Sequence, residues 1–401
     1  MSPYNAATAL YCWEYGAGLG HITALSHIAR RLKNLGFSNS LVNPEGTNFV
    51  NNDAFTSVLT MPNVAQLSGA PTRLSEQIVS YNSSILGFGF NEPRFVFTRL
   101  HLWRALFEEA RPDLVVADYA PAALFAARSI GIPTVATGNG FTLPPANVEQ
   151  YPRFVDKTDP VPAPPILASF NQGATLAGMP RIDALPKIFS ADIHACFTMP
   201  ELDPFAKVRE PKAMGPLLGN SPPRIRKEAS KDAGIFVYLT HCTAQLRANL
   251  LAALAIINHP VSIYSLQITH EDRILTKGTR IEFLERPVPL ASICNENRLV
   301  IHLGGHLLTM ELLLAGMPQL LLPIDMEKIL LAHGVVNKGL AGQLRVDHPK
   351  TIEQIAEKIR TLLRDETLPI RALEFANSRK QSEWHDGLDK LTDQVSKLLQ
   401  I

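Results

Sequence analysis

The stretch ALYCWEYGAGLGHITALSHIARRL, residues 9–32, decides the fold class of the chain. Its first five residues are apolar and predict a strand, and the glycine-rich segment 16–20 predicts a tight turn. Apolar side chains then recur at the spacing of an amphipathic helix: Ile22, Leu25, Ala29 and Leu32. Gly36 is expected to end this helix, because glycine commonly follows a helix C-terminus. The stretch therefore reads as a strand, a turn and a helix.

The same alternation of strands and helices continues along the chain and predicts parallel sheets. In the first part we expect strands at 40–43 and 114–117, with helices at 99–109 and after Pro121. A proline-rich region, 140–223, interrupts the pattern. In the second part we expect strands at 235–239, 261–266, 280–284, 299–302 and 319–322, and helices at 244–257 and 309–315.

A chain of 401 residues exceeds the usual size of a single hydrophobic core, so we expect two domains. The predicted fold class is α/β, with two Rossmann-like domains that face each other across a cleft. The predicted boundaries are an N-terminal domain at 1–210, a linker at 211–233 and a C-terminal domain at 234–383. A terminal helix at 384–401 could pack back on the first domain.

Composition excludes several classes of function. Lys and Arg number 38 and Asp and Glu 37, so the formal charge of +1 offers no basic surface for nucleic acid. The four cysteines are far apart in sequence, which predicts free thiols in a reducing compartment and no metal knuckle. No basic head precedes an apolar run at the N-terminus, and no stretch is long enough to span a bilayer. We therefore expect a cytoplasmic protein.

The first candidate site joins His21, directly after the glycine turn, to Asp118, at the end of the strand 114–117. The partial positive charge at a helix N-terminus disfavours a protonated imidazole, so we expect His21 to act as a neutral base. Asp118 can accept a hydrogen bond from one ring nitrogen, fix the tautomer and stabilise the imidazolium that forms in a reaction. The alternative roles are a polar residue at a helix start for His21 and a helix cap for Asp118.

The second candidate site is the segment 302–306, HLGGH, with Glu311 one helical turn further on. Gly304 and Gly305 lie between a strand and a helix, where backbone N–H groups can bind an anion such as a diphosphate. Glu311 could accept hydrogen bonds from ribose hydroxyl groups. In the alternative interpretation the two glycines only form a turn, and His302 is a core histidine.

These residues carry a resemblance to a known family. The chain resembles the family 1 glycosyltransferases of the GT-B fold, which include macrolide and flavonoid glucosyltransferases and UDP-glucuronosyltransferases. The resemblance covers most of the chain: the turn 16–21, the stretches 111–118 and 131–133, and the segment 300–344. The last segment is the most specific, because it keeps the family's pattern at Gly304, Gly305, Glu311, Gly316, Pro318, Gln319 and Pro323.

The resemblance implies a role for each matching position. His21 is implied as the base that deprotonates the acceptor, Asp118 as its partner and Glu311 as the ribose ligand. Thr240 falls where the family has a Ser or Thr near the donor phosphates, and Val288 lies in the segment whose backbone holds the nucleobase. The implied reaction inverts the sugar's configuration, uses a nucleotide sugar as co-substrate with a small-molecule acceptor, and needs no metal or other cofactor.

The chain also departs from the family pattern. The family's phosphate-binding histidine falls on Leu303 and its Gly-Thr pair on Leu307 and Leu308, and leucine cannot donate a hydrogen bond. The family's sugar-binding Asp-Gln pair falls on Glu327 and Lys328. His302 or His306 could replace the lost phosphate ligand, and Lys328 could face a phosphate or an anionic sugar. Alternatively the donor site has drifted, and the protein is a non-catalytic binding partner.

Aromatic residues are expected to line an apolar acceptor pocket in the first domain, together with Gly18 of the turn. The candidates are Phe88, Phe90 and Trp103. Core packing would place the same residues in the interior, because aromatic side chains are mostly buried in any fold. The remaining alternative function is a nucleotide-sugar epimerase or hydrolase, which shares the architecture but uses no acceptor.

Overall fold

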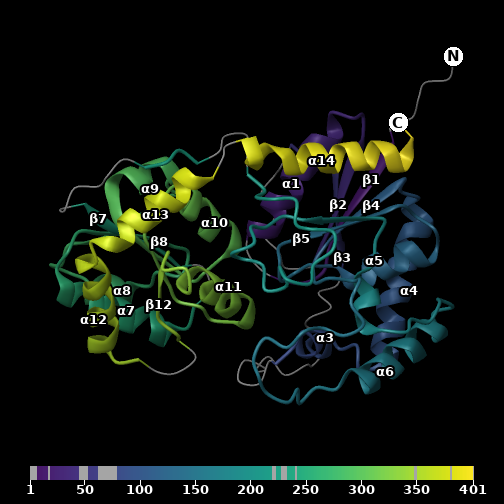
Figure 1. The fold of residues 1–401 in the computed structure, drawn as a ribbon, viewed down its shortest axis with the longest axis horizontal. Coiled ribbons are helices and arrows are strands. Elements are labelled where there is room, and N and C mark those ends of the chain that lie inside the picture. The colour runs from purple at the N-terminus through teal and green to yellow at the C-terminus, as the bar shows by residue number, and fades with distance from the viewer. Residues whose placement is uncertain are drawn as a thin grey trace. The chain divides into compact units, whose positions relative to one another are not determined.

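The computed structural model describes residues 7–16, 19–44, 53–61, 79–218, 223–226, 233–239, 242–346, 350–379 and 382–400, without the side chains of Leu19 and 382–386. The chain forms two compact units. Unit 1 comprises Met1–Leu217 together with Trp384–Ile401, and unit 2 comprises Leu218–Glu383. Each unit is built around one parallel sheet of six strands (Figure 1).

In unit 1 the strand order is β3-β2-β1-β4-β5-β6. The strands are β1 (Thr8–Trp13), β2 (Ser38–Pro44), β3 (Ser57–Met61), β4 (Leu114–Asp118), β5 (Thr134–Gly138) and β6 (Ile193–Cys196). The helices are α1 (Leu19–Lys33), α3 (Asn82–Gly87), α4 (Pro93–Ala110), α5 (Pro121–Ser129), α6 (Ala163–Leu176) and α14 (Ser382–Leu399), with a 3-10 helix η1 (Leu185–Phe189).

The core of unit 1 follows from the apolar pattern of β1 and α1. Leu25, Ile28 and Leu32 of α1 pack on Tyr11 of β1 in one buried cluster. Helix α14, from the far end of the chain, adds Leu391 and Val395 to the same cluster, and Figure 1 shows it (yellow) beside α1. The first and last elements of the chain therefore share one core.

In unit 2 the strand order is β12-β11-β10-β7-β8-β9. The strands are β7 (Gly234–Leu239), β8 (Val261–Ser265), β9 (Ile281–Phe283), β10 (Asn297–His302), β11 (Gln319–Leu321) and β12 (Gly342–Gln343). The helices are α7 (Ala244–Ile257), α8 (His270–Leu275), α9 (Leu290–Glu296), α10 (His306–Leu314), α11 (Met326–Val336), α12 (Ile352–Arg364) and α13 (Thr367–Ser378).

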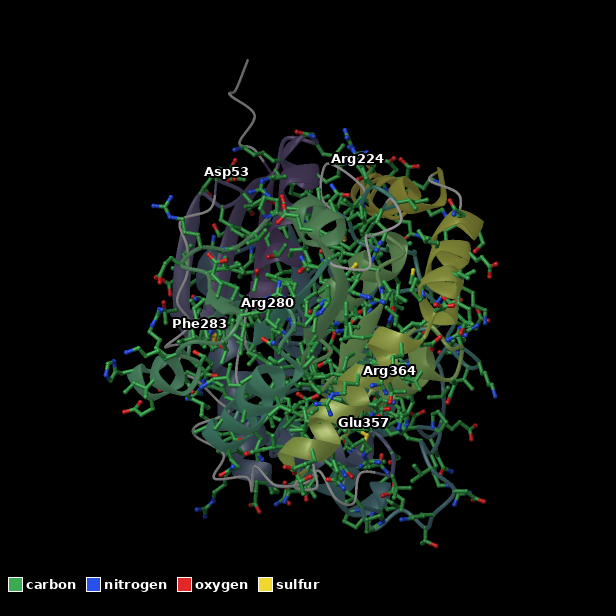
Figure 2. The ribbon with its side chains drawn as sticks, turned by 90° about the vertical axis from the view of Figure 1, so that its left-hand side faces the viewer. Asp53, Arg224, Arg280, Phe283, Glu357 and Arg364 are labelled. Atoms are coloured by element: carbon green, nitrogen blue, oxygen red, sulfur yellow. The ribbon has the colours of Figure 1, made fainter. Side chains whose placement is uncertain are left out.

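Helix α12 shows how the helices of unit 2 are amphipathic. Ile355 and Ile359 belong to the core cluster that includes the apolar side chains of β7 and β10. Glu357 and Arg364, labelled in Figure 2, are exposed on the same helix. One face of the helix therefore covers the sheet and the other faces solvent, as the helical period requires.

The predicted α/β class with parallel sheets is confirmed. The proline-rich region is more regular than we expected, because α6 and β6 lie within it. Pro164 and Pro165 stand in the first turn of α6, where the missing N–H groups would have no helical partner in any case. Prolines there start a helix, and so they do not mark a long loop.

Candidate functional site

The predicted sites lie where the strand order of each sheet reverses. In unit 1 the chain runs outward from β1 through β2 to β3, and then returns to β4 on the other side of β1. In unit 2 the corresponding reversal falls between β7 and β10. Open parallel sheets bind ligands outside the carboxyl ends of the strands at such points. His21 and Asp118 follow β1 and end β4, and the segment 302–306 ends β10 and begins α10.

The sheet of unit 1 brings His21 and Asp118 together. Trp13 is paired with Asp118 in the register of β1 and β4, so these two strands end at the same level. His21, in the first turn of α1, places its Nδ1 atom 3.0 Å from Oδ2 of Asp118. The Asp118 side chain is 3% exposed and that of His21 is 15% exposed. A carboxylate that accepts a hydrogen bond from Nδ1–H leaves Nε2 as the basic nitrogen.

Gly16 makes room for the Nε2 atom of His21. A Cβ atom at position 16 would lie 2.3 Å from Nε2, which is closer than any real contact. Gly16 also has a φ of +92°, a conformation that residues with a side chain rarely adopt. This first glycine of the turn is therefore required by the histidine itself. Gly18, predicted to contact the acceptor, lies outside the described residues.

Glu14 ties the end of β1 to the segment that carries Asp118. Its carboxylate accepts hydrogen bonds at 3.1 Å from the backbone N–H groups of both Ala122 and Ala123, in the first turn of α5. It also accepts from Nε1 of Trp103. Burial raises the pKa of Glu14 to about 7, although the nearby Arg99 and these hydrogen bonds act in the opposite direction. The sequence pattern did not predict a role for Glu14, although a lone carboxylate at the end of an apolar strand is a signal for one.

The three predicted acceptor-binding aromatic residues are buried in the interior of unit 1. Phe88 is 5% exposed, and Phe90 and Trp103 are each 1% exposed. Phe90 packs edge-on against Phe170, and Trp103 stacks on Phe107. These contacts favour core packing for Phe90 and Trp103. Phe88 lies nearer the site, because its ring contacts Tyr119, the residue after Asp118.

In unit 2, His302 supports the turn after β10 and is not presented to a ligand. Its Nδ1 accepts a hydrogen bond of 3.2 Å from the N–H of Gly304, and its Nε2 lies 2.9 Å from Oε1 of Gln319. The residue is 1% exposed, and burial lowers its pKa to about 4. These contacts favour the alternative interpretation of His302 as a core histidine, and the N–H of Gly304 is bonded to it.

The start of α10 is the part of this turn that remains open to an anion. Gly305 is the exposed N-cap residue, and a Cβ atom there would meet nothing within 4 Å. The helix begins at the half-buried His306, and the Thr309 N–H donates to the Gly305 carbonyl at 2.9 Å. Backbone N–H groups at such a helix start can bind an anion. Glu311 follows on the same helix, and burial raises its pKa to about 7.

The first turn of α11 lies against the turn between β10 and α10, at Gly304. A Cβ atom on Gly304 would come within 3.4 Å of Cβ of Lys328. Asp325 caps α11 by accepting from the backbone N–H of Lys328 at 3.0 Å, and its carboxylate also pairs with the Lys328 ammonium group. The half-buried Glu327 is the neighbouring residue. The stem of Lys328 therefore lies beside Gly304, and its ammonium group is shared with the Asp325 carboxylate.

The remaining donor-site positions are apolar or outside the described residues. Leu303 is 4% exposed and belongs to the hydrophobic core of unit 2, whereas Leu307 and Leu308 are half-buried. Val288 and Leu308 both pack against a second core cluster. Thr240 is not among the described residues. In the described part of the chain, no three His, Cys, Asp or Glu side chains are grouped so that they could hold a metal ion.

Comparison with solved structures agrees with this architecture. The chain is 17% identical to the calicheamicin glycosyltransferase CalG4, with a TM-score of 0.67 and 98% of both chains covered. It is 18% identical to the glycosyltransferase of kitacinnamycin, with a TM-score of 0.65 over 98% of this chain and 99% of the other. It is 15% identical to UGT2 of Phytolacca americana, with a TM-score of 0.63 over 99% of both chains, in a complex with UDP-2-fluoroglucose and pterostilbene.

These similarities establish the fold. The chain has the fold of the GT-B glycosyltransferases of family 1, as its resemblance implied. No family model matches the sequence, and no curated protein matches it. Among the described residues, no helix is both long and apolar enough to cross a membrane.

Proposed function

We propose that this protein is an inverting glycosyltransferase, which transfers a sugar from a nucleotide sugar to a hydroxyl group of a small apolar acceptor. The observation that carries the proposal is the 3.0 Å contact between His21 Nδ1 and Asp118 Oδ2, at the strand-order reversal of a chain with a glycosyltransferase fold. Histidine with a buried carboxylate partner is a common general base. We also propose that the protein acts in the cytoplasm and uses no cofactor beyond the nucleotide sugar.

The proposed reaction is a single displacement. Nε2 of His21 takes the proton of the acceptor hydroxyl, and Asp118 stabilises the imidazolium that results. The acceptor oxygen then forms a bond to the anomeric carbon from the face opposite the nucleotide. The bond from that carbon to the diphosphate oxygen breaks, and the diphosphate leaves with the electron pair. One displacement at the anomeric carbon inverts its configuration.

The donor is proposed to bind at the turn between β10 and α10. The backbone N–H groups of the first turn of α10, after Gly305, would bind the diphosphate, and the helix dipole would stabilise its negative charge. Lys328, whose stem lies next to Gly304, would add a cation to this site. Glu311 is half-buried on the same helix, where it could accept from ribose hydroxyl groups.

The test is a transfer assay with a panel of nucleotide sugars and apolar phenolic and alcoholic acceptors, followed by product analysis with and without a chelator. His21→Ala should reduce turnover at least about 100-fold, because a positioned general base contributes roughly that much or more. His27→Ala, a half-buried histidine two turns further along α1, is the matched control and should keep wild-type activity. Retained turnover in His21→Ala would contradict the assigned role.

The apolar residues of the donor turn support a second candidate, a non-catalytic binding protein on the same fold. Leu303 faces the core, and the Gly304 N–H is already bonded to His302. Calorimetric titration with the same nucleotide sugars separates the two functions. Binding without transfer to any acceptor, or no binding at all, would favour this second candidate. Product formation in the absence of acceptor would instead indicate an epimerase or a hydrolase.

A further inference from the structure

Two aromatic rings are stacked on the imidazole of His21. The Trp13 ring is stacked on it at 5.1 Å between centroids, with an angle of 26° between the planes. The Tyr119 ring is also stacked on it, at 6.0 Å and 13°. Trp13 ends β1, and Tyr119 directly follows Asp118 at the end of β4. The two neighbouring strands of the reversal point therefore supply both the carboxylate and the two aromatic rings.

The backbone of Tyr119 holds its ring in this position. Its φ of +49° is left-handed, which is unfavourable for a residue with a bulky side chain. The conformation is held by a backbone hydrogen bond of 3.2 Å from Tyr15 N–H to the carbonyl of Tyr119. The rings of Tyr15 and Phe88 contact the Tyr119 ring edge-on, at 5.9 Å and 5.6 Å. Such strain is typically kept where a side chain must take one position.

Three charged side chains are connected to these rings or to the residues beside them. Asp118 contacts the Nδ1 edge of the imidazole. Arg99, from α4, donates hydrogen bonds to the Tyr15 hydroxyl and to the Phe88 carbonyl. Glu14, next to Trp13, is bonded to the start of α5 and to Trp103. Among these, the carboxylate of Asp118 is the charged group within hydrogen-bond distance of the ring.

We propose that Trp13 and Tyr119 are positioning residues that stabilise the protonated form of His21 and keep its Nε2 against the Gly16 turn. The faces of aromatic rings carry negative charge density, and a cation within about 6 Å of a ring centre is attracted to it. The imidazole becomes such a cation when it takes the acceptor proton. The catalytic consequence rests on the proposed transferase function, whereas the effect on the histidine does not.

The proposal is tested by titrating the histidines of the full-length protein by NMR, after labelling of the imidazole Cε1 position. The signal that disappears in His21→Gln identifies His21. Tyr119→Asn removes the ring, and asparagine tolerates a left-handed backbone. We expect it to lower the pKa of His21 by roughly half a unit to one unit. Tyr119→Phe, the matched control, keeps a ring and should keep the wild-type value.

The sign of the shift decides the result. If Tyr119 only buried the imidazole, its removal would admit water, favour the cation and raise the pKa of His21. A raised or unchanged value in Tyr119→Asn would therefore overturn the proposal. Trp13→Leu should also lower the pKa of His21, and it provides a second variant if Tyr119→Asn does not fold.

An activity measurement separates this proposal from the proposed function. In an active transferase, the acidic limb of the pH profile of kcat/KM should move to lower pH in Tyr119→Asn. Tyr119→Phe, which keeps a ring, should show the wild-type profile. If the pKa of His21 falls in Tyr119→Asn but the wild-type protein has no transferase activity, the role of the rings is supported and the transferase function is rejected. Transferase activity with an unchanged pKa of His21 would support the transferase and reject the role of the rings.

Discussion

At the scale of single residues, Gly16 is the position on which the geometry of His21 depends most directly. Gly16→Ala would place a Cβ atom 2.3 Å from Nε2 of His21, at a φ of +92°. We expect the imidazole to move from Asp118 and transfer activity to fall at least about 100-fold, as in the loss of a general base. We also expect the free energy of unfolding to fall by about 1 kcal/mol or more, because alanine is strained at that φ. Activity assays and denaturant unfolding measure the two effects.

Gly20→Ala is the matched control within the same turn. A Cβ atom on Gly20 would meet nothing within 4 Å, and Gly20 is already in the helical part of α1. Alanine is more favourable than glycine in a helix, so stability should be unchanged or slightly higher. Full activity in Gly16→Ala, or equal losses in both variants, would show that the turn does not depend on this contact.

Residues also show where a sequence is sufficient to predict a site. His21 and Asp118 were paired correctly in space because parallel neighbouring strands end at one edge of a sheet, and this follows from the strand pattern alone. Tyr119 and Glu14 were missed. The contribution of Tyr119 depends on a left-handed backbone, and that of Glu14 on the position of α5. The spacing of residues along the sequence predicts neither contribution.

At the scale of elements, the turn from β10 to α10 depends on a chain of buried hydrogen bonds that starts at His302. Gly304 donates to His302, His302 bonds to Gln319, and Gln319 donates to the Thr309 carbonyl at 3.3 Å. His302→Leu has a similar volume but removes both ring nitrogens. We expect unit 2 to lose roughly 1–3 kcal/mol, because the buried partners are left unsatisfied. His306→Leu, at the half-buried start of α10, is the control and should lower the free energy of unfolding by less.

The contribution of His302 should also depend on pH. Its folded pKa of about 4 lies below the ordinary value of 6.5, so the unfolded chain binds a proton more readily than the folded one. The stabilisation is fully present above about pH 6.5 and is lost as pH falls towards 4. The difference in unfolding free energy between wild type and His302→Leu should therefore shrink over that range. A difference that grows on acidification would contradict this account of the turn.

The elements themselves were predictable where apolar periodicity was strong. Helix 244–257 and the start of the strand 114–117 match α7 and β4 in the structure. The helix predicted at 99–109 begins earlier, at Pro93, because proline is favourable in a first helical turn. Short elements such as β6 and α9 were missed, because a few residues do not establish a period. Their structure is fixed by packing on neighbours that the local sequence does not specify.

At the scale of the whole molecule, the last helix belongs to the first unit. Leu391 and Val395 of α14 are 1% and 0% exposed in the core built by β1 and α1, and Arg31 of α1 pairs with Asp389. Gly387 packs so closely that a Cβ atom there would lie 2.7 Å from the carbonyl oxygen of Met214. Unit 1 is therefore completed only by the end of the chain, after all of unit 2.

This connection predicts that a cavity in α14 weakens unit 1 selectively. Leu391→Ala should lower the stability of unit 1 by roughly 2–5 kcal/mol, because a buried leucine is replaced by a void. Hydrogen exchange followed by mass spectrometry should then show faster exchange in β1 and α1, with little change in β7 and β10. Ile359→Ala, a fully buried residue of α12 in the core of unit 2, is the reciprocal control. Faster exchange in β7 and β10 of Leu391→Ala, without a change in β1, would contradict the assignment of α14 to unit 1.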